Sequence, residues 1–458
     1  MAYFQSWSDN VEIFETYEKG RGIRCKKQLA IGTSVGKENP FCHVVSQDML
    51  SSYCHSCLLM QSELYKCSRC KIIMYCCKSC QKEDWQWHKY ECKSITRLGP
   101  KVPPDSIRLL GRVAYTILQG QDRADQFKFL LSSKYETGTL TTDRELLEGS
   151  RKNTIVDGIN LLKEYLSNKV AINENEIIEI ISRVTCNTFT ICNSEMQTVG
   201  IGVYPGLSLV NHSCSPNCSA TFRGKQMQLR IIENTKIGDE LLISYIDPMQ
   251  VLSSRQNQLQ SQYCFKCICE RCIDTTKDSC NNLMDSVRCP NKICKAASSL
   301  DSLLANKLCP ECGSIVDQSF FAEIENFQAQ INKTISLGYQ QAKLEDLKKL
   351  FIEGKQRLGE CNMLYIRIIE NLMDAYIESQ RYEEALEYAR RLEEPYCRLY
   401  PRYYPVTGVH LMKQGKLECY LGKFGEAVKS LGKAKEILLV SHGKECGLIH
   451  EMNEMVSI

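Results

Sequence analysis

The stretch LVNHSCSPNC, residues 209–218, places two asparagines, one histidine and two cysteines within ten positions. Such a cluster can bind a metal, form part of a catalytic site, or be a polar loop, and its composition alone does not choose among these. Cys214 connects the stretch to a later motif, because Cys267-x-Cys269-x2-Cys272 supplies only three thiolates for a metal that takes four ligands. We take Cys214 as the candidate fourth ligand, although spacing alone cannot assign it.

The composition is that of a globular protein with several domains. The chain has 458 residues, of which 43% are hydrophobic and 24% are charged, and its net charge of +3 indicates no overall preference for nucleic acid. No apolar run approaches the roughly 18 residues needed to span a membrane, and the first residues show no secretory pattern. We therefore expect a reducing compartment, in which clusters among the 27 cysteines are metal ligands rather than disulfides.

Eight cysteine and histidine residues form four close pairs between positions 54 and 92. A Cys-x2-Cys turn lets both thiolates reach one metal, and His88 and Cys92 lie one turn apart on a helix that we expect to be short, at about 81–93. Eight ligands fit two tetrahedral zinc ions, whose roughly 10–16 kcal/mol of folding energy would replace a hydrophobic core. The eight ligands are Cys54, Cys57, Cys67, Cys70, Cys76, Cys80, His88 and Cys92.

A further group of four cysteines is typical of a zinc ribbon. Cys289-x4-Cys294 and Cys309-x2-Cys312 have the form of two metal-binding knuckles, and the proline and glycine beside the thiols favour tight turns. The alternative is a cysteine-bearing loop without metal. We favour zinc, because the four thiols fall into two clean pairs.

Several long motifs, taken in order, carry a resemblance to a known family. They include KGRGIR (19–24), VGIGVYPGLSLVNHSCSPNC (199–218), GDELLISYID (238–247) and QYCFKCICERC (262–272). With these motifs the chain resembles the SET-domain protein lysine methyltransferases, and the cluster at 54–92 resembles a MYND zinc finger. A SET domain interrupted by a MYND finger is similar to the SMYD family.

The resemblance implies a grouping of the zinc ligands that spacing leaves open. In that family the cysteine of the NHSC motif shares a third zinc with three later cysteines, and the pairs of the finger are interleaved. The implied sets are Cys54, Cys57, Cys76 and Cys80; Cys67, Cys70, His88 and Cys92; and Cys214, Cys267, Cys269 and Cys272. The ribbon at 289–312 departs from this pattern. We therefore expect three zinc ions, and a fourth if the ribbon binds one.

The implied fold is α+β and multidomain, with a β-rich SET fold split by the MYND finger. From the N-terminus we expect the first part of the SET domain at 1–48, the MYND zinc finger at 49–94, a helical insert at 100–185, the core SET domain at 186–250, a cysteine-rich post-SET zinc segment at 251–276, a zinc ribbon insertion at 277–316, and a tetratricopeptide-like α-helical domain at 317–458. Within the core, the turn-forming RGK and IGDE break short β-branched runs, as expected between strands.

The C-terminal domain is predicted from a repeated pair of residues. Tyr339-x2-Ala342, Tyr382-x2-Ala385 and Phe424-x2-Ala427 each place a large ring before a small residue, with residue numbers that differ by 43 and 42. This spacing is typical of a tetratricopeptide-like helical array with lengthened repeats. Such an array could be structural, as a wall beside the substrate, or could bind a partner peptide, and the sequence favours neither.

The resemblance implies transfer of a methyl group from S-adenosylmethionine to the ε-amine of a protein lysine. A free lysine has a pKa near 10.4, so supplying its neutral amine costs roughly 4 kcal/mol at cytosolic pH. An apolar aromatic channel would lower that pKa by desolvation. Phe189, Tyr245 and Tyr263 match the rings that line this channel in the family. Tyr245 is our prediction for the catalytic residue, because its hydroxyl would orient the methyl group and the incoming nitrogen.

Other residues match the cofactor site of the family. Glycines in KGRGIR permit close approach of the backbone to a ligand, and in the family this loop contacts the methionine end. The asparagine and histidine of the NHSC motif hold the amino group and the adenine, and an acidic residue at 136 could accept a ribose hydroxyl. The implied cofactor-binding residues are Lys19, Gly20, Arg21, Glu136, Asn187, Asn211, His212, Tyr263 and Phe265.

We therefore predict a protein lysine methyltransferase whose substrate is a histone tail or another protein, in the cytoplasm and nucleus. The alternative is a non-catalytic transcriptional adaptor whose MYND finger binds proline-rich peptides, with the SET core as a scaffold. Such a peptide could also bind the finger of an active enzyme. The finger carries a modest excess of lysine and arginine, which predicts weak nucleic-acid binding at most, and we expect no membrane partner.

Overall fold

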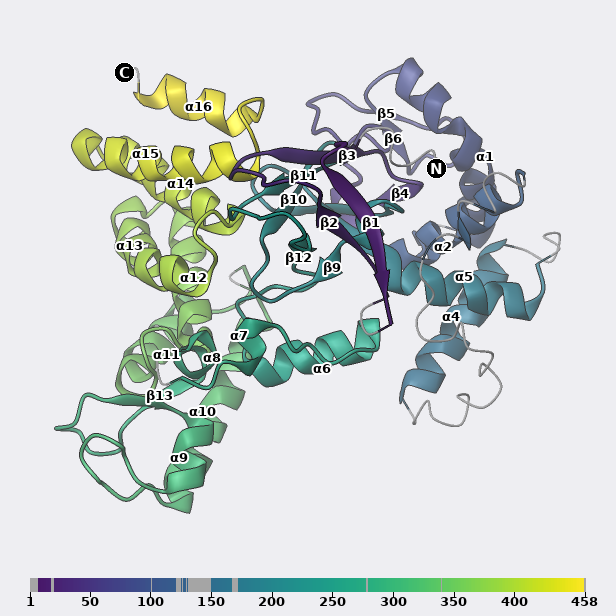
Figure 1. The fold of residues 1–458 in the computed structure, drawn as a ribbon. Helices are drawn as coiled ribbons and strands as arrows, with labels where there is room; N and C mark the ends of the chain where they lie inside the picture. Colours follow the sequence, from purple (N-terminus) through teal and green to yellow (C-terminus); the bar gives the residue numbers. More distant parts are fainter. Residues whose placement is uncertain are drawn as a thin grey trace. The chain divides into compact units, whose positions relative to one another are not determined.

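The computed structural model (Figure 1) describes residues 7–17, 20–99, 101–120, 125, 127–128, 130, 150–166, 172–276, 279–338 and 340–456. It divides into two compact units. Unit 1 comprises Met1–Asn211, Ala220–Leu241 and Gln260–Phe265, and unit 2 comprises His212–Ser219, Leu242–Leu259 and Lys266–Ile458. Short antiparallel strands together with many helices confirm the predicted α+β class. Every helix in the described part of the chain is too short or too polar to cross a membrane.

Unit 1 contains small antiparallel sheets whose strands come from distant parts of the sequence. The pairs are β1 (Val11–Thr16) with β2 (Gly20–Cys25), β4 (Cys42–Val45) with β8 (Thr198–Val203), β8 with β7 (Thr188–Cys192), and β11 (Gln226–Ile231) with both β3 (Ser34–Glu38) and β10 (Cys218–Arg223). Of β10, the residues from Ala220 onward belong to unit 1. Gly224 has φ +57° and forms the predicted RGK turn after β10. Gly200 lets β8 approach β4 closely, because a Cβ atom there would lie 2.2 Å from the carbonyl oxygen of Val44.

The finger of unit 1 combines a two-stranded ribbon with one long helix. β5 (Tyr65–Lys66) pairs with β6 (Met74–Tyr75), and α1 (Lys78–Leu98) follows. We expected a shorter helix at 81–93. The helix begins earlier because the Cys77 sulfur accepts a hydrogen bond from the Cys80 backbone N–H and caps its first turn.

The helical insert belongs to unit 1 and packs against its strand β4. Its described helices are α2 (Asp105–Ile117), α4 (Ser150–Leu166) and α5 (Glu174–Asn187). Asn173 and Glu176 form a capping box at the start of α5. A buried cluster joins α2, α4 and α5 to β4, and it includes Val44, Val113 and Leu162, each with no exposed surface. Burial of this face stabilises the insert more than helix propensity does.

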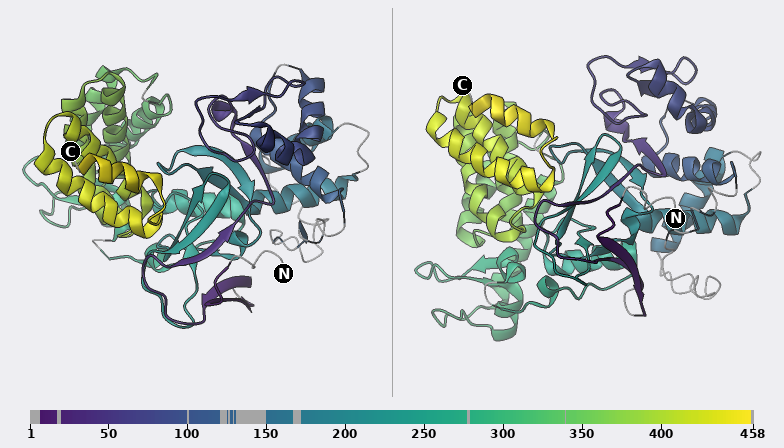
Figure 2. Two further views of the ribbon diagram at one scale, coloured as in Figure 1. Left: turned by 90° about the horizontal axis from the view of Figure 1, so that it is seen from above. Right: turned by 45° about the horizontal axis from the view of Figure 1, so that its top comes forward.

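Unit 2 is mainly helical. Its elements after the NHSC stretch are β12 (Leu242–Ile243), the start of α6 (Leu252–Tyr263), α7 (Glu270–Ile273), α8 (Cys280–Met284), β13 (Ser286–Arg288), β14 (Ala297–Ser299), α9 (Leu300–Asn306), α10 (Gln318–Ile335), α11 (Leu344–Arg357), α12 (Met363–Glu378), α13 (Tyr382–Leu399), α14 (Pro405–Tyr420), α15 (Phe424–Ser441) and α16 (Gly447–Val456). Both views in Figure 2 show the last helices, coloured yellow-green to yellow, lying side by side.

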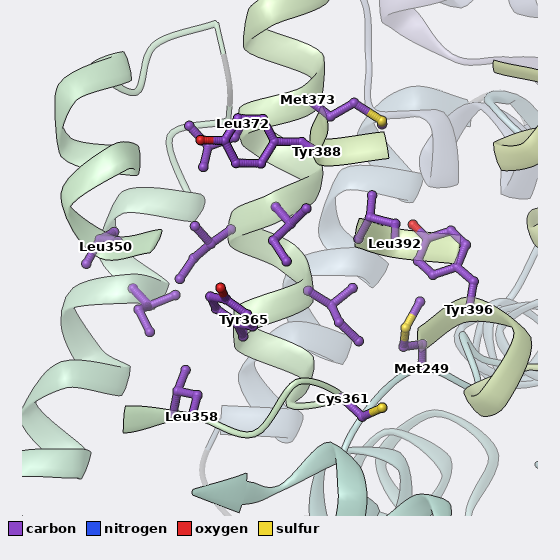
Figure 3. Close-up of a cluster of buried hydrophobic side chains, with 14 of the residues drawn as sticks. Met249, Leu350, Leu358, Cys361, Tyr365, Leu372, Met373, Tyr388, Leu392 and Tyr396 are labelled. Atoms are coloured by element: carbon purple, nitrogen blue, oxygen red, sulfur yellow. The ribbon is translucent and has the colours of Figure 1, made fainter. Parts of the chain in front are cut away.

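The ring and small-residue pairs of the C-terminal region lie at equivalent places on two of these helices. Tyr382 and Phe424 are the first residues of α13 and α15, and Ala385 and Ala427 are buried one turn later. Tyr339, which begins the third pair, lies outside the described residues. Figure 3 shows part of the buried core that the helices share, which includes Leu350, Leu372 and Leu392.

A buried histidine in this core predicts acid sensitivity. Burial lowers the pKa of His410 to about 4, and its ring nitrogen Nε2 lies 2.9 Å from the carbonyl oxygen of Ala389. Because the unfolded chain takes up a proton near pH 6.5 and the folded chain does not, this contribution to stability is complete above pH 6.5 and is lost as the pH falls toward 4. We expect a loss of about 3 kcal/mol over that window.

Urea unfolding of the whole chain at several pH values measures this effect. His410→Gln keeps a side-chain amide that can donate to Ala389 but cannot titrate. The variant should therefore lose less stability than the parent protein between pH 6.5 and 4. Parallel losses in both proteins would show that His410 does not cause the acid sensitivity.

Candidate active site and metal centres

The structure brings the ligands of the finger into two groups of four. One group is Cys54, Cys57, Cys76 and Cys80, and the other is Cys67, Cys70, His88 and Cys92; the ligand atoms of each group lie within 4.8 Å of one another. In the second group the Cys67 and Cys92 sulfurs are 3.9 Å apart, and the Cys70 sulfur is 3.6 Å from Nε2 of His88. Two ligands on one tetrahedral zinc lie about 3.8 Å apart when each Zn–S bond is about 2.3 Å. Both groups therefore fit zinc.

A buried carboxylate orients the histidine ligand of the finger. Oε2 of Glu91 lies 3.2 Å from Nδ1 of His88, which leaves Nε2 for the metal. Burial by itself would raise the pKa of Glu91, but the guanidinium groups of Arg112 and Arg108 hold it well below its usual range. Glu91 is therefore a carboxylate, which accepts the Nδ1 proton and strengthens the histidine as a ligand.

In unit 1 the stretch GRGIR (20–24), which we expected to be a loop, lies in the strand β2 and contacts Asn211. Nδ2 of Asn211 donates to the Arg21 carbonyl oxygen at 3.1 Å and to Oε1 of Glu240 at 2.8 Å. Gly20 has φ +67°, a conformation that favours glycine. Gly22 has no room for a side chain, because a Cβ atom would lie 2.7 Å from the Phe14 ring and 3.0 Å from Nδ2 of Asn211. These contacts hold Asn211 against β2.

The remaining predicted residues of unit 1 lie around the junction of α5 and β7 and at the end of α6. Asn187 is buried at the end of α5, and its Nδ2 donates to the Arg183 carbonyl oxygen at 2.7 Å. Phe189 is half-buried in β7, with its ring edge to face with Tyr204 at 6.2 Å. Burial raises the pKa of Tyr263 to about 12, with a smaller contribution from Cys186. Tyr263 is therefore neutral at physiological pH.

A hydrogen bond holds the end of α6 against α5. The Cys186 sulfur donates to the carbonyl oxygen of Gln262 at 3.8 Å, which ties α5 to the residue before Tyr263. Phe265 follows two residues later and is half-buried. Two further predicted cofactor residues, Lys19 and Glu136, lie outside the described residues.

In unit 2 one histidine connects the predicted catalytic tyrosine to a metal ligand. The backbone N–H of Tyr245 donates to Nδ1 of His212 at 3.0 Å. Because Nδ1 accepts this proton and burial lowers the pKa of His212 to about 4, the neutral ring carries its own proton on Nε2. Nε2 lies 3.3 Å from the sulfur of Cys214 and donates to it. The rings of His212 and Tyr245 are 5.3 Å apart.

Cys214 lies with the three later cysteines in a third group. The sulfurs of Cys214, Cys267, Cys269 and Cys272 are all within 4.8 Å of one another, and those of Cys214 and Cys272 are 3.5 Å apart. The amide of Gln256 pairs with both backbone groups of Cys267, at 2.8 and 3.0 Å, and holds that knuckle in place. Four closed thiolate ligands are typical of a structural zinc.

An arginine that the sequence analysis did not identify offsets the charge of this group. Zinc with four thiolates has a net charge of −2, which is costly to bury without a partner. The side chain of Arg255 is fully buried, and its Nη2 lies 3.7 Å from the Cys272 sulfur and 2.7 Å from Oδ1 of Asn281. No local pattern separates a buried arginine from an exposed one, so only the fold identifies Arg255.

The segment after Tyr245 is held by the C-terminal helices of the same unit. Asp247 accepts from Nη2 of Arg367 at 2.7 Å and from the Tyr400 hydroxyl at 3.1 Å. Met249 is buried in the core of those helices, as Figure 3 shows. His212 and Asp247 therefore fix the backbone on both sides of the Tyr245 side chain.

The four ribbon cysteines also come together. The sulfurs of Cys289, Cys294, Cys309 and Cys312 lie within 4.8 Å of one another.

Glu91 and Glu240, like Arg255, were not identified from the sequence. Glu240 lies inside the motif GDELLISYID, so the motif located it without indicating its bond to Asn211.

Several known proteins are similar in sequence to this chain over nearly its whole length. A family model described as MYND finger matches residues 54–92. The "Histone-lysine N-methyltransferase SMYD3" of Homo sapiens is 32% identical, with 96% of each chain covered. The "Histone-lysine N-methyltransferase ASHR1" of Arabidopsis thaliana is 30% identical and covers 95% of this chain and 92% of its own length. The "N-lysine methyltransferase SMYD2" of Homo sapiens is 27% identical, with 97% of this chain and 98% of that protein covered.

Among solved structures, one titled "Crystal structure of the SET domain of LSMT bound to Lysine and AdoHcy" aligns over 99% of this chain and 96% of its own. Its sequence identity is 12% and the TM-score is 0.30. A score this low supports no argument about the present chain.

Proposed function

The chain belongs to the SMYD family of protein lysine methyltransferases, which use S-adenosylmethionine, and we propose that Tyr245 is its catalytic residue. The observation that carries the proposal is the pair of bonds made by His212, to the backbone of Tyr245 and to the sulfur of Cys214. A protein whose SET core were only a scaffold would not need a half-buried, neutral histidine to position a tyrosine.

The proposed roles follow from the chemistry of methyl transfer. S-adenosylmethionine supplies an electrophilic methyl group when it is bound. The task of the protein is to align the amine, remove water and let the amine lose its proton. We assign alignment to the Tyr245 hydroxyl and desolvation of the lysine to Phe189 and Tyr263. Tyr263 cannot act as a base, because burial holds its pKa far above physiological pH.

We assign cofactor binding to the stretch KGRGIR (19–24) and to Asn187, Asn211, His212 and Phe265. Asn211 bonds the Arg21 carbonyl and Glu240 through its amide nitrogen, so its amide oxygen is the group that can accept from a ligand ammonium. The neutral His212 offers a ring face rather than a charge. Both properties suit a ligand that joins an amino-acid end to an adenine.

The partners and location are part of the same proposal. The substrate is a histone or another protein, and the protein acts in the cytoplasm and the nucleus. We also propose that the MYND finger binds a proline-rich peptide, and that the C-terminal helices are a tetratricopeptide-like array. The placement of Tyr382 and Phe424 at the starts of α13 and α15 supports that array.

A methyl-transfer assay with the whole protein tests the function. The protein is incubated with radiolabelled S-adenosylmethionine and a histone mixture, and separately with a cell extract whose own methyltransferases have been heat-inactivated. We expect label on protein lysines, found by mass spectrometry. If neither mixture gains label and calorimetry detects no cofactor binding, the protein is an adaptor.

A substitution at Gly22 tests the assignment of KGRGIR to the cofactor site. Gly22→Ala would place a methyl group 3.0 Å from Nδ2 of Asn211 and 2.7 Å from the Phe14 ring. This crowding must displace β2, the Phe14 ring or the asparagine. Because small displacements of a binding group cost about tenfold or more, we expect S-adenosylmethionine affinity to fall by at least about tenfold. Titration calorimetry measures it. Gly432→Ala, at a helical site with open space, is the control and should bind normally. If Gly22→Ala bound S-adenosylmethionine as tightly as the parent protein does, the stretch KGRGIR would not be part of the cofactor site.

A further inference from the structure

The ribbon cysteines have the geometry of a metal site rather than of a disulfide or a packed core. The sulfurs of Cys289 and Cys312 are 3.6 Å apart, and those of Cys294 and Cys309 are 3.9 Å apart. Both distances agree with the edge of a zinc tetrahedron, about 3.8 Å, and both are far longer than a disulfide bond of about 2.05 Å. Each close pair joins one knuckle to the other, so a shared metal would link them.

The backbone of each knuckle directs its sulfurs inward. In the first, the Cys289 N–H donates to the Ala296 carbonyl at 3.0 Å, across the base of the loop between β13 and β14. In the second, the Cys309 N–H donates to the Ser314 carbonyl at 2.8 Å, and Gly313 turns the chain with φ +70°. Two separate hydrogen-bonded turns thus bring their four sulfurs within 4.8 Å of one another.

The exposure of two of the ribbon cysteines argues against the reading that all four only fill a hydrophobic core. Cys312 is exposed and Cys294 is half-buried, whereas cysteines that fill a core are fully buried. Cys289 and Cys309 are buried, but packing alone gives the exposed Cys312 and the half-buried Cys294 no reason to lie within 4.8 Å of them. The three other groups in the described chain that meet the same distance limit are those of the finger and the post-SET segment.

We propose that Cys289, Cys294, Cys309 and Cys312 bind a structural zinc ion, the fourth of this protein. Four thiolates close the coordination shell and leave no position for water or substrate, so the site stabilises structure and does not catalyse. It is independent of the methyl transfer proposed above.

The element that this zinc would stabilise is part of the C-terminal core. Val287, Leu303 and Val316 lie within or beside the ribbon, and all three are buried in the cluster that contains the helices α10 to α13. The Ser286 carbonyl oxygen accepts from the backbone N–H of Gly359 at 3.0 Å and from Nδ2 of Asn362 at 2.9 Å.

The contact at Asn362 extends the effect of the metal to a long helix. Asn362 caps the start of α12, because its side chain accepts from the backbone N–H of Leu364 at 2.9 Å. Loss of the metal would therefore loosen both the ribbon and the first turn of α12. We expect the C-terminal helices to become less stable, while the finger keeps its own metals.

Native mass spectrometry of the full chain, purified without chelator, tests the proposal. We expect four zinc ions per chain in the parent protein and three in Cys312→Ser, a change at an exposed position that the core should tolerate. Cys397→Ser is the matched control, since Cys397 is also exposed but belongs to no group of ligands in the described chain. It should keep four.

Thiol labelling of the parent protein tests the same site without a substitution, so its result does not depend on whether Cys312→Ser folds. In the native protein, a maleimide reagent should label Cys397 quickly and Cys312 at least tenfold more slowly, and a strong chelator should remove that difference. Equal labelling of the two thiols before chelation, or three zinc ions in the parent protein, would overturn the proposal.

Discussion

Replacing Tyr245 by phenylalanine is expected to lower kcat for lysine methylation by on the order of 10²–10³-fold. The change deletes only the hydroxyl. The ring beside His212 remains, and so does the backbone N–H that donates to Nδ1 of His212 at 3.0 Å. The cofactor residues therefore keep their arrangement, and the loss falls on the chemical step. A kcat that falls while affinity for S-adenosylmethionine stays within about threefold is the expected signature.

Steady-state kinetics with a labelled peptide measure kcat, and calorimetry measures cofactor binding. Tyr420→Phe is the control, because the Tyr420 side chain is 71% exposed on α14 and should not affect either quantity. Two results would contradict the assignment. A kcat near that of the parent enzyme would show that the hydroxyl is not needed, and a parallel loss of cofactor affinity would make Tyr245 a binding residue.

The sequence predicted best those features that depend on neighbours in the chain. Cys-x2-Cys and His-x3-Cys spacings place ligands on one turn or one helix face, so the clusters could be located before the fold was known. The grouping of Cys54 with Cys76 is different, because these residues come before and after the β5–β6 ribbon in the sequence. Spacing left it open, and only the family resemblance implied it.

Long-range contacts could not be predicted in this way. Asn211 bonds Glu240, which is 29 positions away, and Arg255 reaches Cys272 and Asn281. An arginine in a polar helix is normally exposed, and nothing near Arg255 in the sequence marks it as buried. Its burial follows from the charge of a thiolate cluster that exists only after folding. The helix α1 begins at Lys78 rather than at the predicted residue 81, because Cys77 is its N-cap and cysteine seldom has that role.

The buried charge network between the finger and the insert likewise has no signal in the sequence. Glu91 accepts from Nε of Arg108 at 3.0 Å and from Nη2 of Arg112 at 2.6 Å. Asp84 accepts from Nη1 of Arg112 at 2.8 Å and from the Tyr75 hydroxyl at 2.7 Å. All four charged side chains are at most 1% exposed, and their two positive and two negative charges balance. The network joins α1 of the finger to α2 of the insert.

Glu91→Gln is therefore expected to destabilise unit 1 by about 3–5 kcal/mol, because it leaves the two buried guanidinium groups with one buried carboxylate, Asp84, and the half-buried Asp105 at 3.4 Å from Nη1 of Arg108. The amide is also a poorer acceptor for Nδ1 of His88, and loss of such a partner weakens metal affinity by roughly 10–100-fold. Urea unfolding and competition for zinc with a chromogenic chelator measure the two effects. Glu83→Gln lies on the same helix and is the control, since Glu83 is 53% exposed and its pairing with Lys225 is worth about 1 kcal/mol at most. If Glu91→Gln changed stability no more than Glu83→Gln does, the buried network would not hold the finger to the insert, and His88 would be oriented by its metal alone.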